Sequence, residues 1–118
     1  MNKIIAYLLA AIMILGAAGH VFYPDSYSGL IPEFISDNLA HMLAAVAELA
    51  IGIALLIPKY RKYGGLGLML LMIVFMPLHI WDVVREDPVM GSTTAAWVRF
   101  FVQALFIAGG WWIWDRFR

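Results

Sequence analysis

Four long runs of apolar residues, separated by short polar segments, dominate the pattern of this chain. A helix that crosses the apolar core of a bilayer needs about 20 such residues, and each run has roughly this length. The runs cover residues 4–23, 39–58, 64–84 and 95–115. Because they occupy most of residues 1–118, the pattern predicts an all-α fold: a four-transmembrane-helix bundle, forming a single membrane domain with short connections.

Polar and helix-breaking residues mark the ends of these runs. Pro24 follows the first run, and Pro58 ends the second. Residues 36–38, Ser-Asp-Asn, precede the second run, and the hydroxyl groups of residues 92–94 precede the fourth. Such side chains favour helix N-caps because they accept hydrogen bonds from the free amides of the first turn. The glycine pair at 64–65 is expected to open the third helix.

The composition places such a bundle in lipid. Of the 118 residues, 64% are hydrophobic and 14% are charged, whereas a soluble domain is about half apolar and about a quarter charged. A soluble domain of this size buries only about 60–70% of the surface of its unfolded chain, which is too little to hide so many apolar side chains. The absence of cysteine excludes disulfides, thiol nucleophiles and iron–sulfur clusters. A net charge of zero, without a basic stripe, argues against nucleic acid as a partner.

The distribution of basic residues predicts the orientation of the bundle. One side of a four-span arrangement carries most of the lysines and arginines: Lys3, Lys59, Arg61, Lys62, Arg116 and Arg118. The opposite side is acidic, with Arg85 as its base and the carboxylates Asp25, Glu33, Asp37, Glu86 and Asp87. Short cytoplasmic loops are enriched in lysine and arginine. Both termini are therefore predicted to be cytoplasmic, in a bacterial cytoplasmic membrane.

Residues 1–19 also have features of a secretory signal peptide, namely Lys3, a short apolar core and small residues near its end. Two observations favour a helix that stays in the membrane. The apolar run continues to Tyr23 and so reaches full spanning length. Removal of the first span would also place the basic turn at 59–62 on the outer side, against the usual distribution of charge.

Polar side chains interrupt the apolar runs at a few positions: His20, His41, Glu48, His79, Asp82, Arg99 and Gln103. At 1.5 Å per helical residue, Glu48 and Gln103 lie roughly 13 and about 12 Å below the outer boundary. His79 and Arg99 lie about 7 and about 6 Å below it, and the remaining three lie within about 5 Å. These residues come from four helices, and all of them are predicted to lie in the outer half of the membrane.

Helical spacing groups six of these side chains into pairs on one face of a helix: His41 with Glu48, His79 with Asp82, and Arg99 with Gln103. Polar stripes avoid lipid, so each is expected to face the interior of the bundle. Helical side chains lean toward the N-terminus of their helix. Glu48 and Arg99 are therefore expected to lean outward and His79 inward, which would bring the three together.

Two interpretations of this polar cluster are open. In the first, it is a pocket, open to the outer side, that binds a small molecule or a lipid-like head group. The candidate binding residues are His20, Glu48, His79, Trp81, Asp82, Arg99 and Gln103. In the second, Glu48 and Arg99 form a buried ion pair, and the other residues are interhelical hydrogen-bond partners. Pro77 favours the pocket, because a proline inside a helix leaves a carbonyl unpaired and can kink the helix.

Glu48 and His79 are also the candidate catalytic residues, as an acid–base pair. No metal site is predicted. The Glu-x-x-His repeats of carboxylate-bridged di-iron bundles are absent, and nothing in the pattern supports haem ligation by two histidines.

Several short motifs occur together in a fixed order: Gly19-His20 before Pro24-Asp25, Ala47-Glu48-Leu49, Pro77-x-His79-Ile80-Trp81, and Arg99-x-x-x-Gln103. They cover nearly the whole chain, which in this respect resembles the DoxX-like membrane proteins. The resemblance implies a four-helix integral membrane protein with a polar core of Glu48, His79, Arg99 and Gln103, and with His20 nearby. The namesake of that family is similar to a subunit of a thiosulfate:quinone oxidoreductase. Other relatives assist superoxide defence complexes or act as receptor-assembly chaperones.

Three hypotheses for function follow. The first is an accessory or ligand-binding component of a membrane redox or assembly system, with a quinone, a lipid or a small molecule as its ligand. It is not expected to be an enzyme on its own. The second is a membrane enzyme or oxidoreductase subunit that uses Glu48 and His79. The third is a structural or chaperone-like assembly partner. Besides membrane lipid, a second copy of the chain or another membrane protein is the expected partner.

Overall fold

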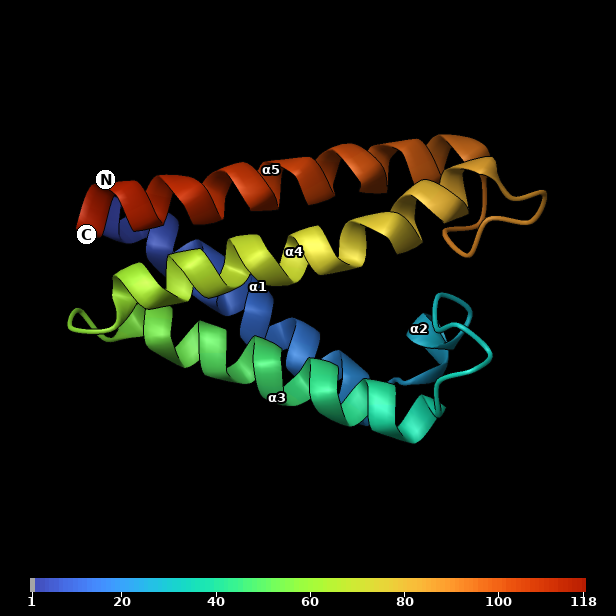
Figure 1. Ribbon diagram of the computed structural model, residues 1–118, viewed down its shortest axis with the longest axis horizontal. Coiled ribbons are helices and arrows are strands. Elements are labelled where there is room, and N and C mark those ends of the chain that lie inside the picture. The colour runs from blue at the N-terminus through green and yellow to red at the C-terminus, as the bar shows by residue number, and fades with distance from the viewer. Residues whose placement is uncertain (1) are drawn as a thin grey trace.

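The computed structural model describes residues 2–118 and is built from helices joined by short segments (Figure 1). Its helices are α1 (Asn2–Phe22), a single turn α2 (Asp25–Ser28), α3 (Asp37–Leu56), α4 (Arg61–Val84) and α5 (Thr93–Phe117). The four long helices are each long and apolar enough to cross a membrane. The prediction of an all-α fold with four spans is confirmed.

The ends of the long helices largely follow the predicted signals. Ser36 caps α3, and its hydroxyl accepts a hydrogen bond from the Leu39 amide at 3.5 Å. Ser92 caps α5 and accepts from the Ala95 amide at 3.0 Å. The start of α4 was predicted wrongly, because the helix begins at Arg61 and contains the glycine pair 64–65. The single turn α2 was not predicted, since four residues are too few to show a helical period.

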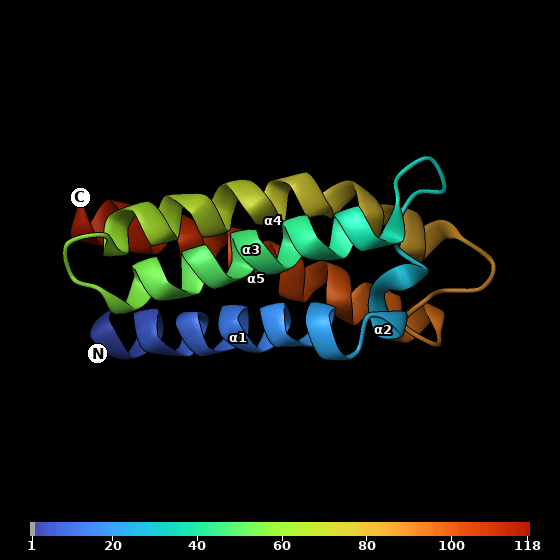
Figure 2. The same ribbon diagram turned by 90° about the horizontal axis from the view of Figure 1, so that it is seen from below.

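Consecutive long helices pack against each other in an up-and-down arrangement. The contacts join α1 to α3, α3 to α4 and α4 to α5. Both termini and the turn at 57–60 lie at one end of the molecule, called here the terminal end (Figures 1 and 2). Segments 23–36 and 85–92 lie at the other end, the loop end. The α1–α3 and α4–α5 pairs are close at the terminal end and diverge toward the loop end in Figure 1.

The apolar core lies in the terminal half of the molecule. Its buried side chains are Ala6, Leu9, Ala10, Met13, Leu55, Leu68, Met72 and Ile113. Glycines bring the backbones of α4 and α5 into direct contact in this half. A Cβ atom at Gly110 would lie 2.6 Å from the Met69 amide nitrogen and 2.7 Å from the Gly65 carbonyl oxygen. Only a residue without a side chain fits at this crossing.

Arg61 is the first residue of α4 and is buried, with 2% of the residue exposed. Its Nε donates to the Leu55 carbonyl at 2.8 Å, and its Nη2 donates to the Leu56 carbonyl at 3.1 Å. The guanidinium also lies 5.3 Å from the ring centres of Tyr7 and Phe117. Arg61 thus supplies donors to carbonyls at the C-terminus of α3, which have no partner within that helix.

Outward-facing apolar side chains cover the four long helices. Leu15 of α1 and Leu105 of α5 are 70% and 69% exposed, and similar residues occur on α3 and α4. The molecule is 42 Å long, compared with about 30 Å for the hydrocarbon core of a bilayer. An apolar surface of this kind and length suits contact with lipid chains.

Candidate functional site

The Glu48 carboxylate lies deep in the interior, against α1. The residue is 7% exposed, and its Oε2 lies 3.6 Å from the Nε2 of His20. The contact depends on Gly16, one turn before His20, because a Cβ at that position would lie 3.1 Å from Oε2. The described ion pair of Glu48 is therefore with His20. The predicted pairing of Glu48 with Arg99, and the acid–base pairing with His79, remain predictions.

A chain of polar contacts continues from His20 toward the loop end. The Nδ1 atoms of His20 and His41 lie 2.9 Å apart, and the Nε2 of His41 lies 3.3 Å from the Ser28 hydroxyl. That hydroxyl donates to the Pro24 carbonyl at 3.1 Å. A continuous path of polar atoms thus leads from the middle of α3 to α2. Neither His41 nor Ser28 was predicted as a site residue, although the seven-residue spacing of His41 and Glu48 was a usable signal.

Arg99 interacts electrostatically with two other side chains of the polar cluster. Its guanidinium lies within electrostatic reach of both the Glu48 carboxylate and the His79 ring. The expected outward lean of Arg99 is wrong, since its Cζ lies 5.6 Å from the ring centre of Phe106, two turns further along α5. A long arginine side chain can reach along its helix toward an aromatic ring, which compensates part of its charge.

Gln103 connects α5 to the turn of α4 that precedes Pro77. It is fully buried, and its Nε2 donates to the Met72 carbonyl at 2.8 Å. Pro77 lies in the next turn of α4 and has no amide to donate to the Ile73 carbonyl. The amide of Gln103 therefore supports the backbone beside a turn that has lost one of its own hydrogen bonds.

Three buried polar atoms of the cluster have no hydrogen-bond partner within residues 2–118: Glu48 Oε2, His79 Nδ1 and Gln103 Oε1. A buried polar atom without a hydrogen bond costs about 1–3 kcal/mol. Such atoms are uncommon in a native interior, and those that occur call for an explanation such as a bound polar group. The cluster thus offers donor and acceptor positions in an otherwise apolar bundle.

Asp82, predicted as a binding residue, is used to hold the loop at 85–92. It is 1% exposed, and its carboxylate accepts hydrogen bonds from the amides of Val89 at 2.6 Å and Met90 at 3.3 Å. Arg85 lies 3.8 Å from the same carboxylate and donates to the Gly29 carbonyl at 3.2 Å. The carboxylate and the guanidinium therefore join α4 to both segments at the loop end.

Trp81 lies beside this loop contact. Its ring is 4.0 Å from the Arg85 Cζ, and the side chain is 44% exposed. This geometry is a cation–π contact, which positions the Arg85 guanidinium. In the described residues Trp81 thus contacts Arg85 at the loop end.

Replacing Asp82 with alanine is expected to loosen this loop without unfolding the bundle. Two amides lose a charged acceptor, each worth about 1.5–3 kcal/mol where it is buried. Hydrogen exchange should therefore accelerate at Val89 and Met90 while the helices remain protected. Asp87→Asn, at an exposed position in the same loop, is the control and should change neither rate. Unchanged exchange in Asp82→Ala would show that other contacts hold the loop.

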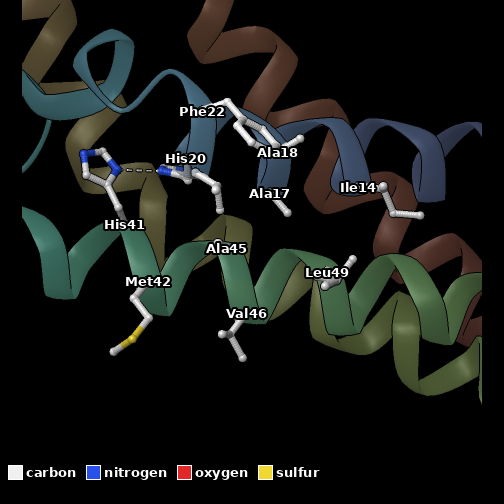
Figure 3. Close-up of a pocket in the computed structure, with 11 residues that line it drawn as sticks. Ile14, Ala17, Ala18, His20, Phe22, His41, Met42, Ala45, Val46 and Leu49 are labelled. Carbon is white, nitrogen blue, oxygen red and sulfur yellow. Dashed lines mark hydrogen bonds between the residues drawn. The ribbon is translucent and has the colours of Figure 1, made fainter.

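An apolar groove lies between α1 and α3 (Figure 3). It has a volume of about 530 Å³, within the range of small-molecule sites. The groove contains the imidazole rings of His20 and His41 at one end and apolar side chains along the rest: Ile14, Ala17, Ala18, Val21, Phe22, Met42, Ala45, Val46 and Leu49. Of the predicted binding residues, only His20 lines it. The groove therefore shares His20 and His41 with the polar cluster, and its other lining residues are apolar side chains of α1 and α3.

A smaller, wholly apolar hollow of about 270 Å³ lies between α4 and α5, where Trp97 and Phe100 meet Ile80, Val83 and Val84. Within residues 2–118, no group of three or more histidine, aspartate or glutamate side chains is arranged to hold a metal ion.

Comparison with known proteins identifies the family. Residues 9–114, which include most of all four long helices, match the family described as "Domain of unknown function (DUF8561)". The chain belongs to this family. Neither a curated protein nor a solved structure matches it. The family match does not identify the chain as DoxX-like.

Proposed function

We propose that this protein is an accessory membrane component that binds an isoprenoid quinone or quinol in the groove between α1 and α3. The observation that carries the proposal is the composition of the groove: apolar along its length, with the His20 and His41 rings at one end. A ligand that matches it has an apolar tail and a neutral, hydrogen-bonding head group. The groove opens along the outward face of two helices, where a ligand could enter from the bilayer.

The lining favours a quinone over a phospholipid. Among the described residues, no lysine or arginine lines the groove, so a phosphate head group would lack a cation from these residues to pair with. A quinone ring instead carries neutral carbonyl oxygens, and an imidazole N–H is a suitable donor for them. The Nε2 of His41 lies 3.3 Å from Ser28, a longer contact than the 2.9 Å between the Nδ1 atoms of His41 and His20, and is therefore the donor of His41 more readily transferred to a ligand.

The DoxX-like resemblance agrees with this assignment, because the namesake of that family is similar to a subunit of a thiosulfate:quinone oxidoreductase. We place both termini on the cytoplasmic side of a bacterial cytoplasmic membrane. The basic side chains at the terminal end support this orientation, among them Lys3, Lys59 and Lys62. A partner membrane protein would then supply the redox chemistry.

Binding of decyl-benzoquinone to the purified protein in phosphatidylcholine nanodiscs tests the proposal. Val46→Trp fills the groove from a position that is 63% exposed, so the core is left intact. We expect at least about a tenfold loss of affinity, which corresponds to about 1.4 kcal/mol. Leu105→Trp is the matched control, since this residue is 69% exposed on α5, and its affinity should equal that of the wild type.

Thermal unfolding without ligand verifies that both tryptophan variants are folded. Equal affinity of the wild type and Val46→Trp would contradict the proposal. Binding that is absent in the wild type, or a groove occupied by phosphatidylcholine that the quinone fails to displace, would contradict it as well.

A further inference from the structure

We propose that Glu48, His20, His41 and Ser28 form a proton relay that connects the interior of the bundle with the loop end. The polar atoms follow one another from α3 through α1 and back to α3, and then to α2, with separations of 3.6, 2.9 and 3.3 Å. Each imidazole takes part through both of its nitrogens, as a carrier that receives a proton on one atom and releases one from the other.

The hydrogen bonds define which ring nitrogen carries hydrogen. Ser28 has a single hydroxyl hydrogen and donates it to the Pro24 carbonyl. The contact between Ser28 and His41 therefore has the His41 Nε2–H as donor, and in the proposed relay the His41 Nδ1 is the acceptor. The short contact between the two rings then requires a hydrogen on the Nδ1 of His20. One further proton lies between the His20 Nε2 and the Glu48 Oε2.

Proton release toward the loop end proceeds through a defined series of bonds. The O–H bond of the Glu48 carboxyl breaks as an N–H bond forms at the His20 Nε2. The Nδ1–H bond of His20 then breaks as one forms at the His41 Nδ1. The Nε2–H bond of His41 breaks as an O–H bond forms at Ser28, and the original hydroxyl proton of Ser28 passes to water at the loop end. A carboxylate remains and one proton leaves, so charge is balanced.

The reverse series returns the proton and restores both tautomers. The relay therefore exchanges protons between Glu48 and the loop end in both directions, and it does not pump them. The relay requires the first contact, at 3.6 Å, to shorten to hydrogen-bonding distance, below about 3.2 Å.

The surroundings of Glu48 give the relay its direction. The described side chains of the apolar core in the terminal half of the bundle are all hydrophobic and cannot carry a proton. The charged or titratable groups that face the path are Glu48 and His41 on α3, His20 on α1, His79 on α4 and Arg99 on α5. Arg99 on α5 acts electrostatically on Glu48, whereas His20 and His41 lead away from Glu48 toward the loop end. Exchange of the Glu48 proton is thus expected from that end.

Nitrogen-15 NMR of histidine-labelled protein in nanodiscs tests the arrangement in the unaltered chain. We expect hydrogen on the Nδ1 of His20 and on the Nε2 of His41, and a coupling across the bond between the two rings. Each signal is assigned by its loss in a His→Gln variant. Hydrogen found on the opposite nitrogen of either ring would overturn the proposal. Ser28→Ala should abolish the tautomer preference of His41, whereas Ser26→Ala, at an exposed position in the same turn, should preserve it.

Infrared spectroscopy in D₂O tests proton transfer itself, without any quinone. The carboxyl band of Glu48, identified by its loss in Glu48→Gln, shifts on deuteration, and its rate of shift measures exchange. His41→Gln keeps hydrogen-bonding groups but cannot carry a proton. We expect it to slow exchange about tenfold, a factor that corresponds to about 1.4 kcal/mol of barrier. An unchanged rate in a folded His41→Gln variant would overturn the relay while leaving the quinone proposal standing.

Discussion

Gly110→Ala is expected to separate α4 from α5 and to destabilise the bundle by at least about 1–3 kcal/mol, the usual cost of overpacking. The new Cβ would lie 2.6 Å from the Met69 nitrogen and 2.7 Å from the Gly65 oxygen. Both are backbone atoms, so no side chain can rotate away to make room. The two helices have to move apart, and the packing of Ile113 against Gly65 is lost with them.

Gly109→Ala is the matched control for this variant. Among the described residues, a Cβ at Gly109 meets the Cδ1 and Cδ2 of Leu9, at 3.4 and 3.8 Å, which are ordinary contacts with a flexible side chain. Because alanine is favoured over glycine inside a helix by about 0.5–1 kcal/mol, this variant should be as stable as the wild type or slightly more so. Unfolding in detergent micelles with increasing dodecyl sulfate measures both. If the two variants unfold alike, the backbone contact between α4 and α5 is not what limits stability.

Arg61→Ala is expected to destabilise the protein by about 3 kcal/mol or more. The variant removes two charged hydrogen bonds to the C-terminal carbonyls of α3, and such bonds contribute about 1.5–3 kcal/mol each. It also opens a gap between Tyr7 and Phe117, whose rings now enclose the guanidinium. The last turn of α3 should fray. Faster hydrogen exchange of the amides in the turn at 57–60 would show this.

Lys62→Ala separates this effect from a simple loss of positive charge. Lys62 is the next base in the chain and its ammonium lies over the Tyr63 ring rather than on a helix end. We expect a change within about 0.5 kcal/mol, as for most surface substitutions. Arg61→Lys should recover only part of the stability, because an ammonium cannot reproduce the forked geometry of the guanidinium. Equal stability of Arg61→Ala and Lys62→Ala would show that the bonds to α3 contribute nothing.

The four helices were predictable because lipid imposes a strong constraint on sequence. A spanning segment must satisfy its backbone internally and present apolar side chains over about 20 residues, and this requirement is visible in the runs themselves. Local signals placed the N-caps at Ser36 and Ser92 for the same reason, since a cap involves residues only three positions apart. The start of α4 was less predictable, because glycines in a helix can serve the packing of a neighbouring helix.

The polar residues of the interior were predictable as a group, while their contacts were not. Spacing indicated that His41 and Glu48 share a face, but the position of Gly16 against that carboxylate depends on how α1 crosses α3. The same holds for Asp82, whose partners are amides of Val89 and Met90 in a loop without a regular period. Arg99 was given the wrong lean because a long side chain follows its neighbours rather than the average direction of helical side chains.

The sequence by itself determined that the chain forms four helices long and apolar enough to span a membrane, because this depends on the order of apolar residues alone. The depth of each polar side chain in the membrane stays a prediction from helical rise. The tertiary structure decided what each of those side chains contacts. The crossing of α1 and α3 joins Glu48 to His20 and His41 and leaves an apolar groove beside them. The physical reason is that helix crossings are set by small residues and shape on two helices at once, which no period along a single helix can express.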